Sequence, residues 1–177
     1  MPRRSAYRLF PLTGLALLPA TGQATVYMTA EQAQAAMYPG KALRPDFRDL
    51  TPDQVTAIRK ASGESSLSKQ LKAWRSPDGG WFIVDEVVGK HEFITYAVSL
   101  DGAGGVRDVE ILDYREAYGG QVRDPRWRQQ FVGKRPGQPL KLGPDIKNIS
   151  GATLSSKHVT DGVRRLLATY AIVLAHG

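Results

Sequence analysis

Three consecutive runs of β-branched and aromatic residues, at 81–88, 93–100 and 106–112, constrain the fold more than any other feature of the chain. Such runs are typical of β-strands. Only the segments 89–92 and 101–105 separate them, and the second, DGAGG, has the glycines of a hairpin turn. Links this short join neighbouring strands that run in opposite directions, so the sequence predicts an antiparallel sheet.

Helical patterns precede this sheet. Residues 29–32 and 51–54 both have the capping-box order, Thr followed three residues later by Gln, and each predicts the start of a short helix. A third helix is expected next, because Leu67, Leu71 and Trp74 recur at helical spacing before a Pro-Asp-Gly-Gly turn.

A long helix is expected at the end of the chain, over residues 155–175, where apolar residues recur at intervals of three and four. These patterns predict an α+β fold in which helices flank an antiparallel sheet. The expected organisation is one domain over residues 25–177, with a helical N-terminal portion at 25–76.

The N-terminus has the layout of a secretory signal. Arg3, Arg4 and Arg8 precede an apolar run at residues 9–20, and small residues lead to Ala24. We expect cleavage after Ala24, which places the mature protein in the periplasm or on the outer face of the cytoplasmic membrane. An uncleaved anchor is the alternative, although the apolar run is shorter than the about 18 residues that a spanning helix needs.

Charge and composition narrow the classes of function. The formal charge falls from +7 to +4 when the three arginines of residues 1–24 are set aside. No nucleic-acid-binding module accompanies the basic residues, so no nucleic-acid partner is expected. The chain contains no cysteine, which excludes disulfides, thiolate metal sites and iron–sulfur clusters. The three histidines lack the spacing of a metal site on a helix, and any redox chemistry must therefore use another centre.

The segment NISGATLSS at residues 148–156 leads directly into the last helix. A helix start offers free backbone N–H groups and the positive end of the helix dipole, which favour a phosphate group. The small residues Gly151 and Ala152 would let a ligand approach the backbone closely. The alternative is that Ser155 or Ser156 simply caps the helix.

A long irregular segment, residues 115–149, precedes this motif and holds one short helical candidate near 126–131. Loops of this length in a small domain are commonly functional.

Residues 150–156, SGATLSS, resemble the motif of the FMN-binding domain found in the flavinylated subunits of sodium-translocating NADH:quinone reductases and of related electron-transport complexes. The resemblance extends upstream to EAYGG at 116–120, Trp127 and QFVGK at 130–134. It implies that FMN is attached covalently to Thr153 through a phosphoester. The cofactor-binding residues that it implies beside Thr153 are Ser150, Gly151, Ala152, Leu154, Ser155, Glu116, Tyr118, Gly119, Gly120 and Lys134.

The resemblance implies an exported electron-transfer flavoprotein, which acts as an electron carrier or as a component of a redox complex rather than as a stand-alone enzyme. Its implied partners are a flavin transferase for maturation and membrane or periplasmic redox proteins. Family members usually have an acidic residue three places before the motif serine, where this chain has Lys147. The alternative function is a non-catalytic envelope domain that binds a ligand or partner without covalent flavin.

Overall fold

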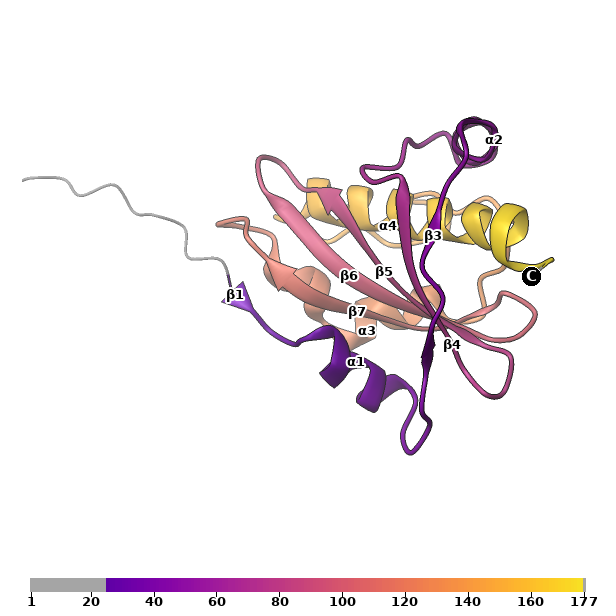
Figure 1. Cartoon of the computed structure of the whole chain (residues 1–177). Helices are drawn as coiled ribbons and strands as arrows, with labels where there is room; N and C mark the ends of the chain where they lie inside the picture. The colour runs from indigo at the N-terminus through magenta and orange to yellow at the C-terminus, as the bar shows by residue number, and fades with distance from the viewer. Residues whose placement is uncertain (1–24, 177) are drawn as a thin grey trace, which may run out of the picture.

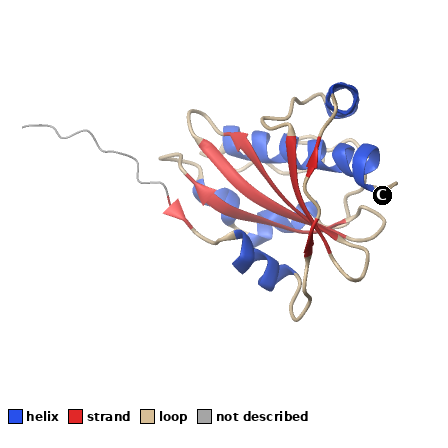
Figure 2. Ribbon diagram, in the orientation of Figure 1, coloured by secondary structure: helices blue, strands red, loops and turns tan. Residues whose placement is uncertain are grey.

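An antiparallel sheet forms the centre of the computed structural model, which describes residues 25–176 (Figures 1 and 2). The expected three strands form its middle as β5 (Trp81–Val88), β6 (Phe93–Leu100) and β7 (Val106–Tyr114). Both neighbouring pairs are antiparallel. The prediction of an α+β fold built on an antiparallel sheet is confirmed.

Four shorter strands complete the sheet. β1 (Thr25–Val26) pairs with β7, and β4 (Gln70–Arg75) pairs with β5. The two-residue strands β2 (Arg44–Pro45) and β3 (Arg48–Asp49) both pair with the outer edge of β4. The order across the sheet is therefore β1-β7-β6-β5-β4-β2, with β3 also beside β4.

The helices begin where their capping signals indicate. α1 (Ala30–Met37) and α2 (Pro52–Ser62) both start with a complete capping box, which satisfies backbone N–H groups that the helix itself leaves free. The long C-terminal helix is α4 (Thr153–Thr169), and a π-helical turn at Tyr170–Leu174 continues it. The expected long helix after the motif is confirmed.

The two faces of the sheet carry cores of different size. α1 covers one face, where Tyr38, Phe82 and Leu112 belong to a small buried cluster. α4 covers the other face and the larger core, to which the neighbouring strand residue Ile83 contributes. Successive strand residues point to opposite faces, so the sheet is buried on both sides. This sandwich fixes the start of α4 against the sheet.

The third expected helix is wrong, because Gln70–Arg75 forms strand β4. Leu71 and Ala73 are buried while Gln70 and Lys72 are exposed, which is the alternation of a strand. Leu71 lies in the core beneath α4, whereas Trp74 packs against the core beneath α1. The helical spacing of the apolar residues is overridden by pairing with β5, and the portion 25–76 is helical only in part.

The segment between β7 and α4 contains three short helical turns: Gly120–Arg123, α3 (Pro125–Arg128) and Gln129–Phe131. The expected helical candidate near 126–131 is confirmed. No helix among residues 25–176 is long and apolar enough to cross a membrane. The expected secretory signal at residues 1–24 lies outside the described residues.

Candidate functional site

The SGATLSS motif forms the turn that leads into α4 and the first turn of the helix. Its N-cap residue is Ala152, and no side chain caps the helix. The first helical hydrogen bond is donated by the Ser156 N–H to the Ala152 carbonyl, so the preceding N–H groups of the first turn have no partner within the helix. The alternative of capping by Ser155 or Ser156 is wrong, because both lie within the helix and are buried.

Thr153 is the first residue of α4, and its side chain is exposed. Its Oγ1 accepts a hydrogen bond from Asn148 Nδ2 at 3.0 Å. Ser150 and Gly151 are exposed beside it, and a Cβ at Gly151 would meet no atom within 4 Å. The hydroxyl is therefore accessible at a helix N-terminus with open space on the motif side.

Trp127 and Gln130 position the segment that carries Asn148. The Trp127 indole N–H donates to the Lys147 carbonyl at 2.7 Å, and Gln130 Oε1 accepts from the Lys147 N–H at 2.8 Å. Trp127 is buried and packs edge-on against Phe131. It holds the backbone in front of the motif and does not offer its ring to a ligand.

Tyr114, at the end of β7, connects the 116–120 loop to α4. Its hydroxyl lies 2.8 Å from Ser155 Oγ and donates to the Tyr118 carbonyl. Burial raises the pKa of Tyr114, so its hydroxyl stays protonated. Sequence reasoning missed this residue, for which the only available signal was its place at the end of a strand immediately before the loop.

The loop residues Tyr118, Gly119 and Gly120 come next to the motif. Gly119 has a φ of +97°, and a Cβ there would lie 2.7 Å from Ser155 Oγ. The Tyr118 side chain is 87% exposed, and Gly120 faces the Tyr27 hydroxyl. The structure therefore brings this part of the expected site to the first turn of α4.

Glu116 serves the neighbouring turn instead of pointing at Thr153. Its Oε1 accepts hydrogen bonds from the backbone N–H groups of Lys90, His91 and Glu92, the last at 2.9 Å. Partial burial raises the pKa of Glu116, but the three donors outweigh it and hold the pKa below its ordinary value. An ionised Glu116 thus joins the end of β7 to the β5–β6 turn.

Lys134 lies away from the motif. Its carbonyl accepts a hydrogen bond from the Val106 N–H, at the start of β7. The motif lies at the other end of that strand, where Tyr114 contacts Ser155. Nine strand residues separate the two ends by about 26 Å. The structure does not bring Lys134 together with Thr153.

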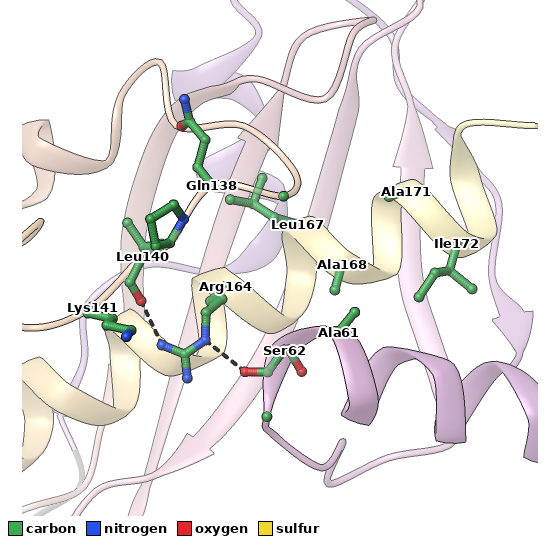
Figure 3. Close-up of a pocket in the computed structure, with 13 residues that line it drawn as sticks. Ala61, Ser62, Gln138, Leu140, Lys141, Arg164, Leu167, Ala168, Ala171 and Ile172 are labelled. Carbon is green, nitrogen blue, oxygen red and sulfur yellow. Dashed lines mark hydrogen bonds between the residues drawn. The ribbon is translucent and has the colours of Figure 1, made fainter.

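Two sizeable cavities among those of the described residues lie beside α4. The larger, of about 720 Å³, lies between α2, the 137–141 loop and the C-terminal half of α4, where Arg164 donates to the carbonyls of Leu140 and Ser62 (Figure 3). Arg164 is eleven residues beyond Thr153, about 16 Å along the helix. The smaller, of about 390 Å³, lies between the β5–β6 turn and α4 and is lined by His158. It begins nearer to the motif, one turn beyond Leu154.

A comparison with models of known protein families matches the segment that contains most of these residues. The family model described as the FMN-binding domain matches residues 89–168, which run from the β5–β6 turn almost to the end of α4. No curated protein matches the chain. The matched segment includes the loop at 116–120 and Lys147, whose backbone is held by Trp127 and Gln130. It also includes Thr153 at the uncapped N-terminus of α4. The segment 89–168 of this chain therefore matches the FMN-binding domain family.

Proposed function

We propose that this protein is an exported electron-transfer flavoprotein that carries FMN on Thr153 through a phosphoester. The observation that carries the proposal is the exposed Thr153 hydroxyl at an uncapped helix start, within a segment that matches the FMN-binding domain family. When bound, FMN supplies one- and two-electron redox chemistry. The partners that we propose are a flavin transferase and redox proteins in or beside the membrane.

The residues around Thr153 fit a phosphoester. One negative charge would lie at the N-terminus of α4, where the helix dipole favours it by about 0.3–1 kcal/mol. The uncapped N–H groups of the first turn can donate to the phosphate oxygens. Gly151 leaves space on the motif side. The site therefore holds a phosphate by backbone groups and needs no cationic side chain.

Asn148 orients the acceptor hydroxyl. By donating to Thr153 Oγ1, it fixes the side-chain rotamer and leaves the hydroxyl proton directed elsewhere. Attachment requires a phosphoanhydride of FMN, such as a flavin dinucleotide, as donor. Thr153 Oγ1 forms the new bond to phosphorus, the anhydride bond breaks with release of the nucleotide, and the hydroxyl proton passes to a base of the transferase.

Export supports a covalent link. The signal-like N-terminus predicts a location outside the cytoplasm. Free FMN is scarce there, so FMN that is bound only reversibly would dissociate and be lost. A phosphoester keeps one flavin on each chain.

The test is covalent flavin on chains coexpressed with a flavin transferase in the exporting compartment. Thr153→Ala should abolish the in-gel fluorescence after denaturation, while the control Thr56→Ala, which removes an exposed hydroxyl of α2 outside the motif, should retain it. Mass analysis of the peptide containing residues 151–154 locates the modification. Covalent flavin on Thr153→Ala would move the attachment to another hydroxyl.

A second variant, Lys147→Asp, introduces the acidic residue that family members usually have at this position. Both hydrogen bonds of Lys147 are made by its backbone, so the substitution leaves the pinned segment in place. The amount of covalent flavin per chain should rise if the transferase recognises the side chain at position 147. Absence of flavin on both wild type and Lys147→Asp would favour a non-redox envelope domain.

A further inference from the structure

Large exposed apolar side chains gather at one end of the sheet. Among residues 25–176, eight such side chains are exposed, and two of them, Phe47 and Val132, lie elsewhere. We call the remaining set the apolar end; its members are Val26, Leu67, Val88, Phe93, Tyr118 and Leu154. Apolar residues exposed singly are ordinary, whereas a concentration of them marks an interaction surface.

Strand register places the strand members of this set together. Val88 and Phe93 pair across β5 and β6 on either side of the 89–92 turn. Tyr114 pairs with Ile94, next to Phe93, and also with Thr25, which precedes Val26. The end of β7, the β5–β6 turn and β1 therefore share one end of the molecule, opposite the C-terminus (Figure 1).

The other three members are linked to the same end by backbone or neighbouring residues and by a shared cavity. The Tyr118 carbonyl accepts a hydrogen bond from Tyr114, whose hydroxyl also contacts Ser155 beside Leu154. Leu67 lines the smaller cavity together with Val88.

Unpaired cations outnumber unpaired carboxylates at this end. Arg115 pairs with Asp113, and Lys157 pairs with Asp161. Lys90, Arg123 and Lys147 have no ion pair within the described part of the chain, although Arg123 stacks on Tyr27. Glu116 is engaged by backbone N–H groups, which leaves Glu86 and Glu92 as the two carboxylates at this end without an ion pair among the described residues. Apolar side chains interspersed with free cations suit an anionic, apolar partner.

The path of the chain indicates the same partner. Residues 1–24 contain three arginines and an apolar run, and they join the described chain at Thr25, which pairs with Tyr114 at the apolar end. Before the expected cleavage after Ala24, a chain held at a membrane by that segment presents this end to the bilayer first.

We propose that the apolar end docks onto the surface of an anionic phospholipid bilayer. Exposed side chains such as Phe93 and Tyr118 enter the interfacial region, as aromatic residues do at membrane surfaces, and the free cations contact anionic headgroups. If Thr153 carries FMN as proposed above, docking holds the flavin near the bilayer, within reach of a membrane-embedded redox partner. Docking itself is independent of flavin attachment.

The first experiment is flotation of the expected mature chain, residues 25–177, so that the arginines and apolar run of residues 1–24 do not contribute to binding. The vesicles are made of phosphatidylglycerol and phosphatidylethanolamine, or of phosphatidylcholine. The variant pair Val88→Thr with Phe93→Thr removes apolar surface at 41% and 42% exposed positions. Both positions then hold threonine, which is favourable in strands. The matched control, Val132→Thr with Phe47→Thr, changes the same residue types at 39% and 51% exposed positions elsewhere. Partitioning onto anionic vesicles should fall by about tenfold in the first pair and remain unchanged in the control.

A second measurement does not depend on loss of binding. The chain has no cysteine, so Phe93→Cys and Phe47→Cys each provide a single site for an environment-sensitive fluorophore. Anionic vesicles should shift the emission to the blue at position 93 but not at position 47. Equal shifts at both positions, equal partitioning of both variant pairs, or absence of wild-type binding would overturn the proposal. Absence of vesicle binding together with self-association that requires Phe93 would assign this surface to a second copy of the chain.

Discussion

Gly119→Ala tests whether contact between the 116–120 loop and α4 shapes the site. Gly119 has a φ of +97°, and an added Cβ would lie 2.5 Å from Tyr114 Oη and 2.7 Å from Ser155 Oγ. The left-handed backbone alone destabilises an alanine by about 1–2 kcal/mol. Relief of the overlap must displace Tyr114 or Ser155, which adds about 1–3 kcal/mol. We expect the free energy of unfolding to fall by about 3 kcal/mol in total.

Gly133→Ala is the matched control. Gly133 also has a positive φ, +80°, but no atom lies within 4 Å of its added Cβ. It should therefore show only the backbone penalty of about 1–2 kcal/mol. Urea unfolding of both full-length variants, followed by tryptophan fluorescence, gives the two free energies of unfolding.

The difference between the two variants isolates the packing of the loop on α4, and it should be about 2 kcal/mol. Flavin loading should also fall in Gly119→Ala and not in Gly133→Ala, because Ser155 belongs to the first turn that begins with Thr153. The reasoning would be refuted if the free energies of unfolding of the two variants agreed within about 0.5 kcal/mol, which is the usual effect of a neutral surface change.

Three further predictions concern the support of the site. Gly162→Ala should destabilise by about 2 kcal/mol in urea unfolding, in spite of better helix propensity, because its Cβ would collide with the Tyr96 hydroxyl. Asp85→Asn should lower the free energy of unfolding by about 3 kcal/mol, because the buried Arg165 guanidinium loses the carboxylate 2.6 Å away. The pKa of Glu116 is lowered, so its stabilising contribution is present above its ordinary pKa of 4.5 and is lost as the pH falls below it. Thermal melting across acidic pH should therefore show a shallower loss of stability for Glu116→Gln than for wild type, and parallel curves would contradict this.

Local signals in the sequence determined much of the fold. The two capping boxes fix the starts of α1 and α2, because the hydrogen bonds that they make join residues three apart. The short links between β5, β6 and β7 fix an antiparallel meander, since such links leave no other pairing. The Thr153 motif was recognisable for the same reason: its residues are contiguous, and they lead into a helix whose apolar stripe is visible in the sequence.

Long-range packing decided what these signals could not. Residues 70–75 form a strand because their backbone pairs with the edge of β5 and their apolar side chains pack into the cores on both faces of the sheet. These interactions outweigh a weak helical spacing. Glu116 binds the β5–β6 turn, and Trp127 is buried behind the motif, although both lie in the stretch that resembles the family. Tyr114 entered the site through strand register, while Lys134 lies near the opposite end of β7. Sequence thus determined the residue that we propose for attachment, whereas only the tertiary structure decided which side chains surround it, because those contacts join residues far apart in the chain.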